Sequence, residues 1–358
     1  MTQFIIRRLL LSIPVLFGIV FVVFALARLL PGDPCLSSLG ERATEAQCAA
    51  FRVRYGLDQP VLVQFGIYLR DALSGDLGNS VKFGRPVTEM LGQRLPVTIE
   101  LAFFALLFAV SVGIPLGLLS AIRRNSKVDV GTMVIANLGI STPVFVLGLV
   151  FVYLFAIVFK DTPLALPPSG RLSSGMEVTP VAVAWGLEGL TGPLRGVLDV
   201  LSNFYILASL ITGQWAALFD GLRHMILPAV VLGTIPLAII ARITRSSLLD
   251  TLQLDYMRTA RAKGLGERLV VFRHGMRNAL LPVVTVIGLQ MGALLGGAVL
   301  TETVFNLAGV GRSVYEAITG RDYVVIQAFT LVIAVGYVVI NLIVDVSYAF
   351  LDPRIRLR

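Results

Sequence analysis

Long apolar runs are the feature that most restricts what this chain can fold into. They lie at about residues 9–30, 97–122, 131–159, 226–248, 280–301 and 324–348. A helix needs about 20 apolar residues to cross a bilayer, and each run is that long. Only 15% of the residues are charged, whereas a soluble domain carries about a quarter. The sequence therefore predicts an all-α integral membrane protein, a single domain over 1–358 with about six transmembrane helices.

The first run could be mistaken for a signal peptide, because it follows Arg7 and Arg8 near the start of the chain. It is longer than the apolar region of a signal peptide, and the segment after it, Leu30-Pro31-Gly32-Asp33-Pro34, is not a small-residue cleavage site. We therefore expect a retained first span.

Lysine and arginine are unevenly distributed between the two sides that six spans define. The side holding both termini carries 16 of the 30 Lys and Arg residues but only 6 of the 22 Asp and Glu residues. Cytoplasmic loops retain cations, so this side is expected to be cytoplasmic, together with the loop 249–278. Loops 31–95 and 160–225 are then extracytoplasmic. The net charge of +8 has a topological origin and indicates no nucleic-acid partner.

A seventh apolar stretch, 197–219, contains Asp199, Asn203 and Gln214. Counting it as a span would put the basic loop 249–278 on the side opposite to Arg7 and Arg8. We predict an interfacial or hairpin helix here.

Both cysteines of the chain, Cys35 and Cys48, fall in the first extracytoplasmic loop. An oxidising exterior permits a disulfide between them, and closing so short a loop would contribute about 2–3 kcal/mol. The alternative is that both are small residues that merely pack.

The cytoplasmic loop contains the most informative segment of the chain. Small residues at Thr259, Ala260 and Ala262 allow a short helix to approach a partner closely, Gly264 suits a helix C-terminus, and the cations favour that negative end of the helix dipole. A loop lying on anionic lipid is the alternative. The candidate coupling residues are Asp255, Tyr256, Arg258, Thr259, Ala260, Arg261, Ala262, Lys263, Gly264 and Leu265.

This segment resembles the conserved cytoplasmic loop of ABC-importer permeases, the EAA loop, whose coupling helix docks on an ATPase subunit. Arg258-Thr259-Ala260 stands at the Glu-Ala-Ala positions, Gly264 at the matching glycine, and Leu281-Pro282 follows late. These departures are typical of the peptide-importing branch. Further matching motifs are Leu30-Pro-Gly-Asp-Pro34, Tyr55-Gly-Leu-Asp-Gln-Pro60, Gly75-Asp-Leu-Gly78, Arg85-Pro86-Val87, His224-Met-Ile-Leu-Pro228, Gly309-Val-Gly-Arg312, Arg321-Asp-Tyr323 and Asp352-Pro-Arg-Ile-Arg356.

The resemblance covers nearly the whole chain and is closest to the first of two permeases in dipeptide or oligopeptide importers of the bacterial or archaeal cytoplasmic membrane. Only residues 172–222 match poorly, which indicates an insertion of open role. The resemblance implies a heterodimer with a homologous permease, two cytoplasmic ATPase chains and an extracytoplasmic solute-binding protein. Members of this branch carry dipeptides, longer peptides, glutathione or nickel complexes, and the sequence does not choose among them.

The resemblance also implies that ATP and Mg²⁺ bind to the partner ATPases and that this chain is a translocation subunit without catalysis. The sequence has no Gly-x-x-x-x-Gly-Lys-Ser/Thr phosphate loop. Its two histidines, His224 and His274, are separated by spans and do not form a zinc motif, so no metal site is expected.

Polar residues inside spans are costly and therefore informative. They are candidates for lining the translocation path, or they form hydrogen bonds between helices worth about 0.6–2 kcal/mol each. Asp345 could also extend to the cytoplasmic interface. The candidates are Glu100, Asn137, Ser141, Gln290, Asn341 and Asp345.

Gly288, Gly292 and Gly296 recur at four-residue spacing in the fifth span. Such a stripe lets another helix approach closely, either as a sliding contact or as static packing. Gly113 and Gly117, with Pro115 between them, form a weaker pattern, because proline kinks a helix.

Two other classes of protein remain as alternatives. A secondary transporter needs no ATPase, but it usually shows internal repeats and broken helices, and we find no repeat. An intramembrane enzyme needs a catalytic dyad or metal cluster, which the residues within the spans do not offer.

Overall fold

The computed structural model of the chain describes residues 2–351 except 30–34, 36–42, 55 and 81. These residues form helices and no β-strand within the described ranges. Five helices are long and apolar enough to cross a membrane, and two bent helix pairs would raise the number to seven. The predicted six spans fall within that range. The five are Ile6–Leu26, Val87–Ile122, Trp215–Leu252, Glu267–Gly296 and Tyr323–Val344.

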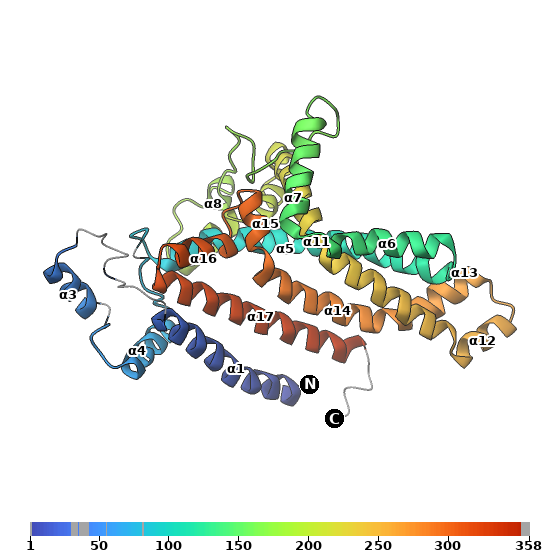
Figure 1. The fold of residues 1–358 in the computed structure, drawn as a ribbon, viewed down its shortest axis with the longest axis horizontal. Helices are drawn as coiled ribbons and strands as arrows, with labels where there is room; N and C mark the ends of the chain where they lie inside the picture. The colour runs from blue at the N-terminus through green and yellow to red at the C-terminus, as the bar shows by residue number, and fades with distance from the viewer. Residues whose placement is uncertain (1, 30–34, 36–42, 55, 81, 352–358) are drawn as a thin grey trace.

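The long helices lie side by side along the length of the molecule (Figure 1). One end of this bundle carries α12 (Asp255–Ala262) and α13 (Glu267–Leu269), and we call it the α12 end. The opposite end carries α3, α4 and α16, and we call it the α16 end. The bundle consists of α1 (Thr2–Leu29), α5 (Val87–Ile122), α6 (Lys127–Ser141), α11 (Trp215–Leu252), α14 (Met276–Gly297) and α17 (Tyr323–Leu351).

Shorter helices connect or cover these long ones. At the α16 end are α3 (Glu45–Arg54), α4 (Val61–Leu73), α15 (Val299–Val304) and α16 (Val310–Thr319). Two π-helical segments, η1 (Tyr153–Val158) and η2 (Val270–Gly275), extend α7 (Val144–Val152) and α13. The stretch predicted as an insertion holds α8 (Val181–Ala184), α9 (Pro193–Ser202) and α10 (Tyr205–Ile211).

The predicted third span, 131–159, is not one straight helix. It consists of α6 and then α7 with η1, and the two parts meet at an angle of 101°, so that α7 stands away from the bundle in Figure 1. Thr142 has extended backbone (φ −101°, ψ 128°) because the ring of Pro143 disfavours helical geometry in the residue before it. The sequence prediction of one span over 131–159 missed this bend.

Residues 197–219 do not form one straight helix, and we call the bent pair of helices here the α9–α10 hairpin. Here α9 and α10 meet at 106°, with Asn203 and Phe204 between them. The next helix, α11, already begins at Trp215, well before the predicted start of the fourth span at 226. Its 38 residues give a length of about 57 Å, far more than the hydrocarbon core requires.

The closest contact in the bundle joins α5 to α11. A methyl group added to Gly117 would lie 2.4 Å from the carbonyl oxygen of Ala241, and one added to Gly113 would lie 2.9 Å from that of Leu237. From the other side, a methyl group on Gly233 would lie 2.6 Å from the carbonyl oxygen of Ala105. Backbone cannot move aside as a side chain can, so only glycine permits this spacing.

The stripe in the fifth span packs against side chains of α17, whereas α5 and α11 meet backbone to backbone. Added methyl groups at Gly288 and Gly292 would meet side chains, those of Val344 at 2.1 Å and Tyr337 at 2.8 Å. At Gly296 nothing lies within 4 Å. The weaker sequence pattern, Gly113 and Gly117, therefore marks the contact in which helix backbone lies against helix backbone.

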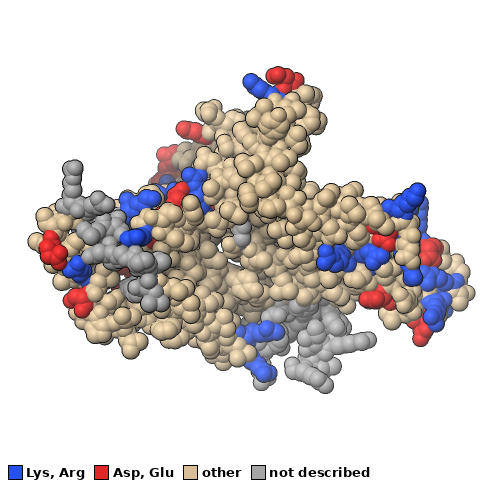
Figure 2. All heavy atoms as spheres, viewed as in Figure 1, with Lys and Arg blue, Asp and Glu red and all other residues tan. Residues whose placement is uncertain are grey.

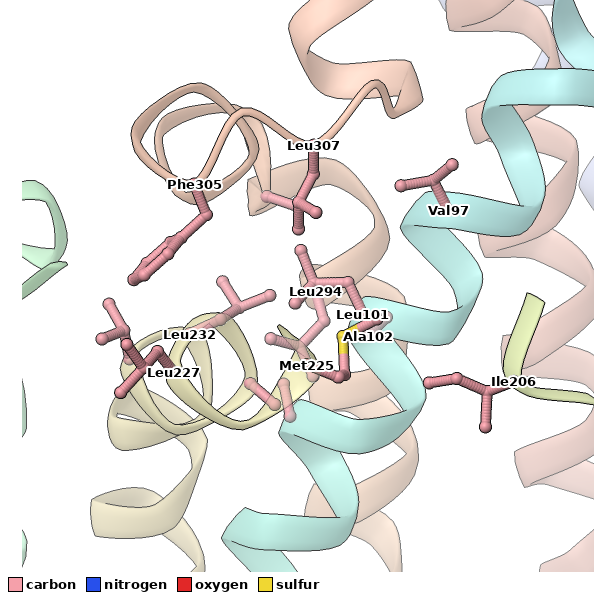
Figure 3. Packing of buried hydrophobic residues seen from close by; sticks show 14 of the residues in the cluster. Val97, Leu101, Ala102, Ile206, Met225, Leu227, Leu232, Leu294, Phe305 and Leu307 are labelled. Atoms are coloured by element: carbon pink, nitrogen blue, oxygen red, sulfur yellow. The ribbon is translucent and has the colours of Figure 1, made fainter. Parts of the chain in front are cut away.

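The largest buried apolar cluster lies where α5, α10, α11 and α14 meet the segment that follows α15 (Figure 3). Leu101 from α5 and Leu227 from α11 are almost fully buried there, as are Phe305 and Leu307. This cluster fixes the α16 end of the α5–α11 pair.

Candidate functional site

The segment with the strongest functional pattern forms α12, directly after α11. Only Gln253 and Leu254 separate the two helices. Gly264 ends this segment with a φ of +76°, a conformation that favours glycine. The helix predicted from the sequence is therefore present, and it is attached to the longest helix of the bundle.

Two residues of α12 hold it against the rest of the chain. Met257 is fully buried and Ala260 is 7% exposed, and both pack in a small cluster with Val270, Leu252 and Leu265. The phenol oxygen of Tyr256 adds a polar contact, since it accepts a 2.7 Å hydrogen bond from the side-chain amide of Asn278 in α14. The helix is thus seated on α11, η2 and α14.

The other residues of α12 form a polar, exposed face. The ions on this face are held by neighbours: Arg261 donates two hydrogen bonds to Glu267, at 2.8 and 3.1 Å, which raise the pKa of Arg261. Figure 2 shows charged side chains gathered at this end of the molecule, whereas the middle of the bundle is mainly uncharged. The exposed residues are Asp255, Tyr256, Arg258, Thr259, Arg261, Ala262, Lys263 and Gly264.

Ala260 therefore has a different role from its neighbours. The sequence grouped it with residues that approach a partner, but its side chain faces the chain's own core. Leu265 is half-buried in the same cluster. A bulky residue at position 260 would displace α12 itself, so the exposed residues are the ones that can contact a second protein.

A buried ion pair next to α12 was not anticipated from the sequence. Asp129, at the start of α6, accepts two 2.8 Å hydrogen bonds from the guanidinium of Arg245 in α11. Ser120 in α5 donates a further hydrogen bond to Asp129, as does the backbone N–H of Asn125. This network, the Asp129–Arg245 pair, fastens the α5–α6 turn to α11 at the α12 end.

Glu100, a candidate for the translocation path, is buried at the α16 end of α5 and does not line an open surface. Its carboxylate accepts a 2.8 Å hydrogen bond from Arg171 and a 2.9 Å hydrogen bond from the backbone N–H of Ile206 in α10. Arg171 also lies over the ring of Tyr205, with its guanidinium carbon 3.6 Å from the ring centre. The Glu100–Arg171 pair therefore anchors the α9–α10 hairpin to the bundle.

Asn137 and Ser141 lie together on α6, with Asn137 half-buried and Ser141 exposed. The side-chain oxygen of Asn137 accepts a 2.8 Å hydrogen bond from Arg242 in α11. Gln290 in α14 and Asn341 in α17 are half-buried. The structure thus groups two of the candidates with an arginine that the sequence interpretation did not include. Asp345 belongs to α17, but its side chain lies outside the described part.

A second buried acid, Glu302, organises the α16 end. It accepts hydrogen bonds from the hydroxyl of Thr98 (2.6 Å) and from the backbone N–H of Arg312 (2.8 Å) at the start of α16. A methyl group on Gly309 would lie 2.3 Å from its carboxylate. The motif Gly309-Val-Gly-Arg312 therefore leaves room for Glu302 to cap α16, a role that the motif alone did not reveal.

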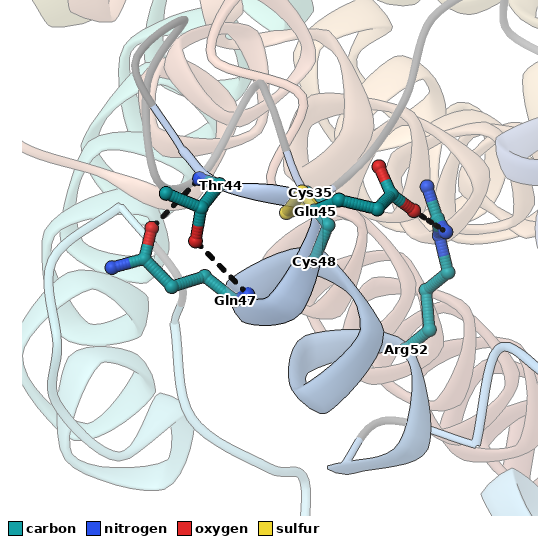
Figure 4. The surroundings of a disulfide bond; sticks show 6 residues. All are labelled: Cys35, Thr44, Glu45, Gln47, Cys48 and Arg52. Carbon is teal, nitrogen blue, oxygen red and sulfur yellow. Dashed lines mark hydrogen bonds and ion pairs between the residues drawn. A yellow bond between two sulfur atoms is a disulfide. The ribbon is translucent and has the colours of Figure 1, made fainter.

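The two cysteines, Cys35 and Cys48, form a disulfide with a Cα–Cα distance of 5.4 Å (Figure 4). Thr44 begins the adjacent helix, where its hydroxyl and the side chain of Gln47 exchange hydrogen bonds with each other's backbone N–H. These contacts brace the segment before α4.

The histidines are placed separately. His224 in α11 is buried and its Nδ1 lies 2.9 Å from the carbonyl oxygen of Asp220. His274 lies in η2, where its carbonyl oxygen faces Tyr256. Within the described residues, no group of three or more His, Cys, Asp and Glu side chains could hold a metal ion.

Comparison with known proteins identifies one family of membrane transport proteins over nearly the whole chain. Residues 113–357 match the family described as the binding-protein-dependent transport system inner membrane component, and residues 1–102 match its N-terminal region. The chain is 42% identical to a dipeptide transport system permease protein of Alkalihalophilus pseudofirmus over 356 residues, 99% of this chain and 100% of the relative.

Two further relatives are similar over almost their full lengths. A di/tripeptide transport system permease protein of Pseudomonas aeruginosa is 42% identical over 357 residues, 99% of each chain. An oligopeptide transport system permease protein of Bacillus subtilis is 38% identical over 356 residues, also 99% of each. Together with the apolar helices and the seated α12, these matches show that the chain is a multi-pass membrane protein of the binding-protein-dependent transport system inner membrane component family.

Proposed function

We propose that this chain is a permease subunit of an ATP-driven importer that carries dipeptides and oligopeptides across the cytoplasmic membrane. Its partners are a homologous second permease, two ATPase chains on the cytoplasmic side and an extracytoplasmic binding protein that delivers the peptide. ATP and Mg²⁺ bind to the ATPases, and this chain makes or breaks no covalent bond. Relatives named for dipeptide, di/tripeptide and oligopeptide transport support this substrate class.

The observation that carries the proposal is the two-sided character of α12. Met257 and Ala260 fix one side of it to the chain, while its other side is exposed and rich in polar and charged residues. Many surface helices have such a face, and it is the resemblance of residues 255–264 to the EAA loop that assigns this one to a partner. We assign the exposed face to the ATPase, with Arg258, Thr259 and Lys263 as its principal contacts.

The packing supports a way for movement of α12 to reach the other end of the bundle. A two-residue link joins α12 to α11, and glycines lock α11 to α5 along the bundle. Any displacement of α12 then carries α11 and α5 with it. In a pair of permeases, this displacement opens the passage alternately to the two sides.

Orientation follows from charge. The α12 end carries the basic residues of the 249–278 loop and the α5–α6 turn, including Arg123, Arg124 and Lys127, and cations are retained in the cytoplasm. We therefore assign the α12 end and both termini to the cytoplasm. The disulfide between Cys35 and Cys48 is compatible with an oxidising compartment at the α16 end.

The test is co-purification of the chain after co-expression with its genomic neighbours. We expect ATPase chains to accompany it in mild detergent and their ATPase activity to rise when binding protein loaded with dipeptide is added. The double variant Arg258→Glu/Lys263→Glu replaces two positive charges on the exposed face of α12 with negative ones. We expect the ATPase chains to be lost from the purified complex.

The matched control is Arg70→Glu in α4, another exposed arginine, far from α12 and paired with Asp71 at the surface. It is expected to retain the ATPases. Recovery of the intact chain without any ATPase would contradict the proposed function, and stimulation by a nickel complex or glutathione in place of peptides would reassign the substrate.

A further inference from the structure

Arg242 is a charged residue in an unusual position. It lies in α11, its side chain is exposed, and its guanidinium donates a 2.8 Å hydrogen bond to the side-chain oxygen of Asn137 in α6. Asn137 lies ten positions after Lys127, the first residue of α6, a rise of about 15 Å. The hydrogen bond holds the guanidinium at the level of Asn137, so the charge does not extend back to the basic turn.

The neighbouring arginine shows how this fold neutralises a charge when it serves the structure. Arg245 lies one turn further along α11 and is matched by Asp129 with two hydrogen bonds. Among the described residues, no carboxylate lies within ion-pair distance of Arg242, whose hydrogen-bond partner there is a neutral amide. Two arginines three positions apart thus differ in that one is neutralised within the chain and the other is not.

An exposed guanidinium at this depth does not face lipid, because the cost of a charge inside the bilayer is high. Two polar residues lie one turn from Arg242 and Asn137: Ser246 on α11 and Ser141 on α6 are also exposed, each with its hydroxyl bonded to a backbone carbonyl of its own helix. Figure 2 shows basic side chains where α6 and α11 lie side by side, set inward from the charged α12 end. These polar side chains fit the wall of a water-filled passage, which they share with exposed apolar residues such as Val134 and Leu138 of α6.

We propose that Arg242 binds the terminal carboxylate of the peptide as it moves through the cytoplasmic half of the passage. This inference rests on the proposed function and adds to it a residue with a stated role. The terminal carboxylate is the negatively charged group that all unmodified peptides share, whatever their side chains. A guanidinium offers a planar pair of N–H groups that matches a carboxylate, and Asn137 occupies only one of its donors. Asn137 is a positioning residue, because its hydrogen bond holds the guanidinium of Arg242 toward the passage.

The experiment uses the complete importer in proteoliposomes with its binding protein. Two probes differ only at the terminus: alanyl-alanine and alanyl-alaninamide. Loading of the binding protein with each probe is verified by a change in its intrinsic fluorescence, so that uptake is compared at equal loading. The variants are Arg242→Gln and Arg242→Lys, with Arg223→Gln as control. Arg223 is a second exposed arginine of α11, bonded to the carbonyl oxygen of Ala165 near the α16 end.

We expect Arg242→Gln to lower uptake of alanyl-alanine about tenfold, the size of a lost charged hydrogen bond, and to leave uptake of the amide unchanged. Arg242→Lys keeps the positive charge but not the planar pair of N–H donors, and we expect a smaller loss of alanyl-alanine uptake than for Arg242→Gln. Arg223→Gln is expected to match the wild type with both probes. The number of peptides transported per ATP hydrolysed is expected to fall in Arg242→Gln, while binding-protein-stimulated ATPase activity persists.

Equal effects on the acid and the amide, or no effect on either, would overturn the inference. Loss of the second permease from the purified Arg242→Gln complex would also overturn it, and would assign Arg242 to a subunit contact instead. If the wild-type importer takes up neither probe, the proposed peptide function fails and this inference with it.

Discussion

An ion pair between an arginine and a carboxylate lies at each end of the α5–α11 pair, but the two ion pairs connect different elements. At the α16 end, Glu100 binds Arg171, and at the α12 end, Asp129 binds Arg245, each at 2.8 Å. The first pair is more completely enclosed, since its arginine is 14% exposed against 29% for Arg245. Water that reaches Arg245 lowers the cost of separating that pair.

The partners of the two pairs also differ. Arg171 belongs to a loop, so the Glu100–Arg171 pair holds the α9–α10 hairpin in place. Arg245 belongs to the helix that continues to α12, so the Asp129–Arg245 pair holds the element we propose to move. The two ion pairs have the same geometry but differ in burial and in what they connect: Glu100–Arg171 joins α5 to the α9–α10 hairpin, and Asp129–Arg245 joins α6 to α11.

The glycine contact between α5 and α11 connects the two ends of the bundle, and we expect its disruption to have the largest effect. Replacing Gly117 by leucine would force a side chain against the backbone of Ala241, and we expect a loss of about 4 kcal/mol in the free energy of unfolding or no folded protein at all. Thermal unfolding in detergent, followed by size-exclusion chromatography, measures this. Gly296→Leu is the control, because nothing lies within 4 Å of that position; equal losses for both variants would contradict a tight α5–α11 contact.

The next largest effect is expected from Glu100→Gln, which leaves the buried guanidinium of Arg171 without its counter-charge. We expect about 3 kcal/mol of destabilisation. Protease digestion from the extracytoplasmic side should then cut the α9–α10 hairpin faster than in the wild type. A hairpin as resistant as in the wild type would show that the pair is not its anchor.

A smaller loss, about 2 kcal/mol, is expected from Asp129→Asn, because Arg245 can turn partly toward water. Its distinctive effect is functional: with the fastening weakened, ATP hydrolysis should proceed with less peptide transported per ATP. The assay is ATPase activity and uptake measured on the same proteoliposomes. Unchanged coupling in a folded Asp129→Asn complex would mean that the pair is only structural.

Sequence reasoning predicted long apolar helices and the short helix α12 because these follow from local patterns of apolar and small residues. The pairings of Asp129 with Arg245 and of Glu302 with Thr98 join residues 116 and 204 positions apart, and no local pattern specifies such a contact. The proline at 143 did not by itself predict a sharp bend, because the prolines at 228 and 236 lie inside the continuous helix α11. Gly288 and Gly292 were found by their spacing, whereas Gly113 and Gly117 were undervalued because of Pro115.

The most direct test of the account is whether α12 and the α9–α10 hairpin move as one body. Both native cysteines are joined in the disulfide, so spin labels can be attached specifically at Gln253→Cys, directly before α12, and at Val197→Cys, two exposed positions. Electron–electron resonance then measures their separation in the assembled importer with and without ATP. The account predicts a change of less than about 2 Å within the chain, the size of a helix shift, while a Val197 label moves relative to the second permease. A large change of the distance within the chain would contradict a rigid α5–α11 connection.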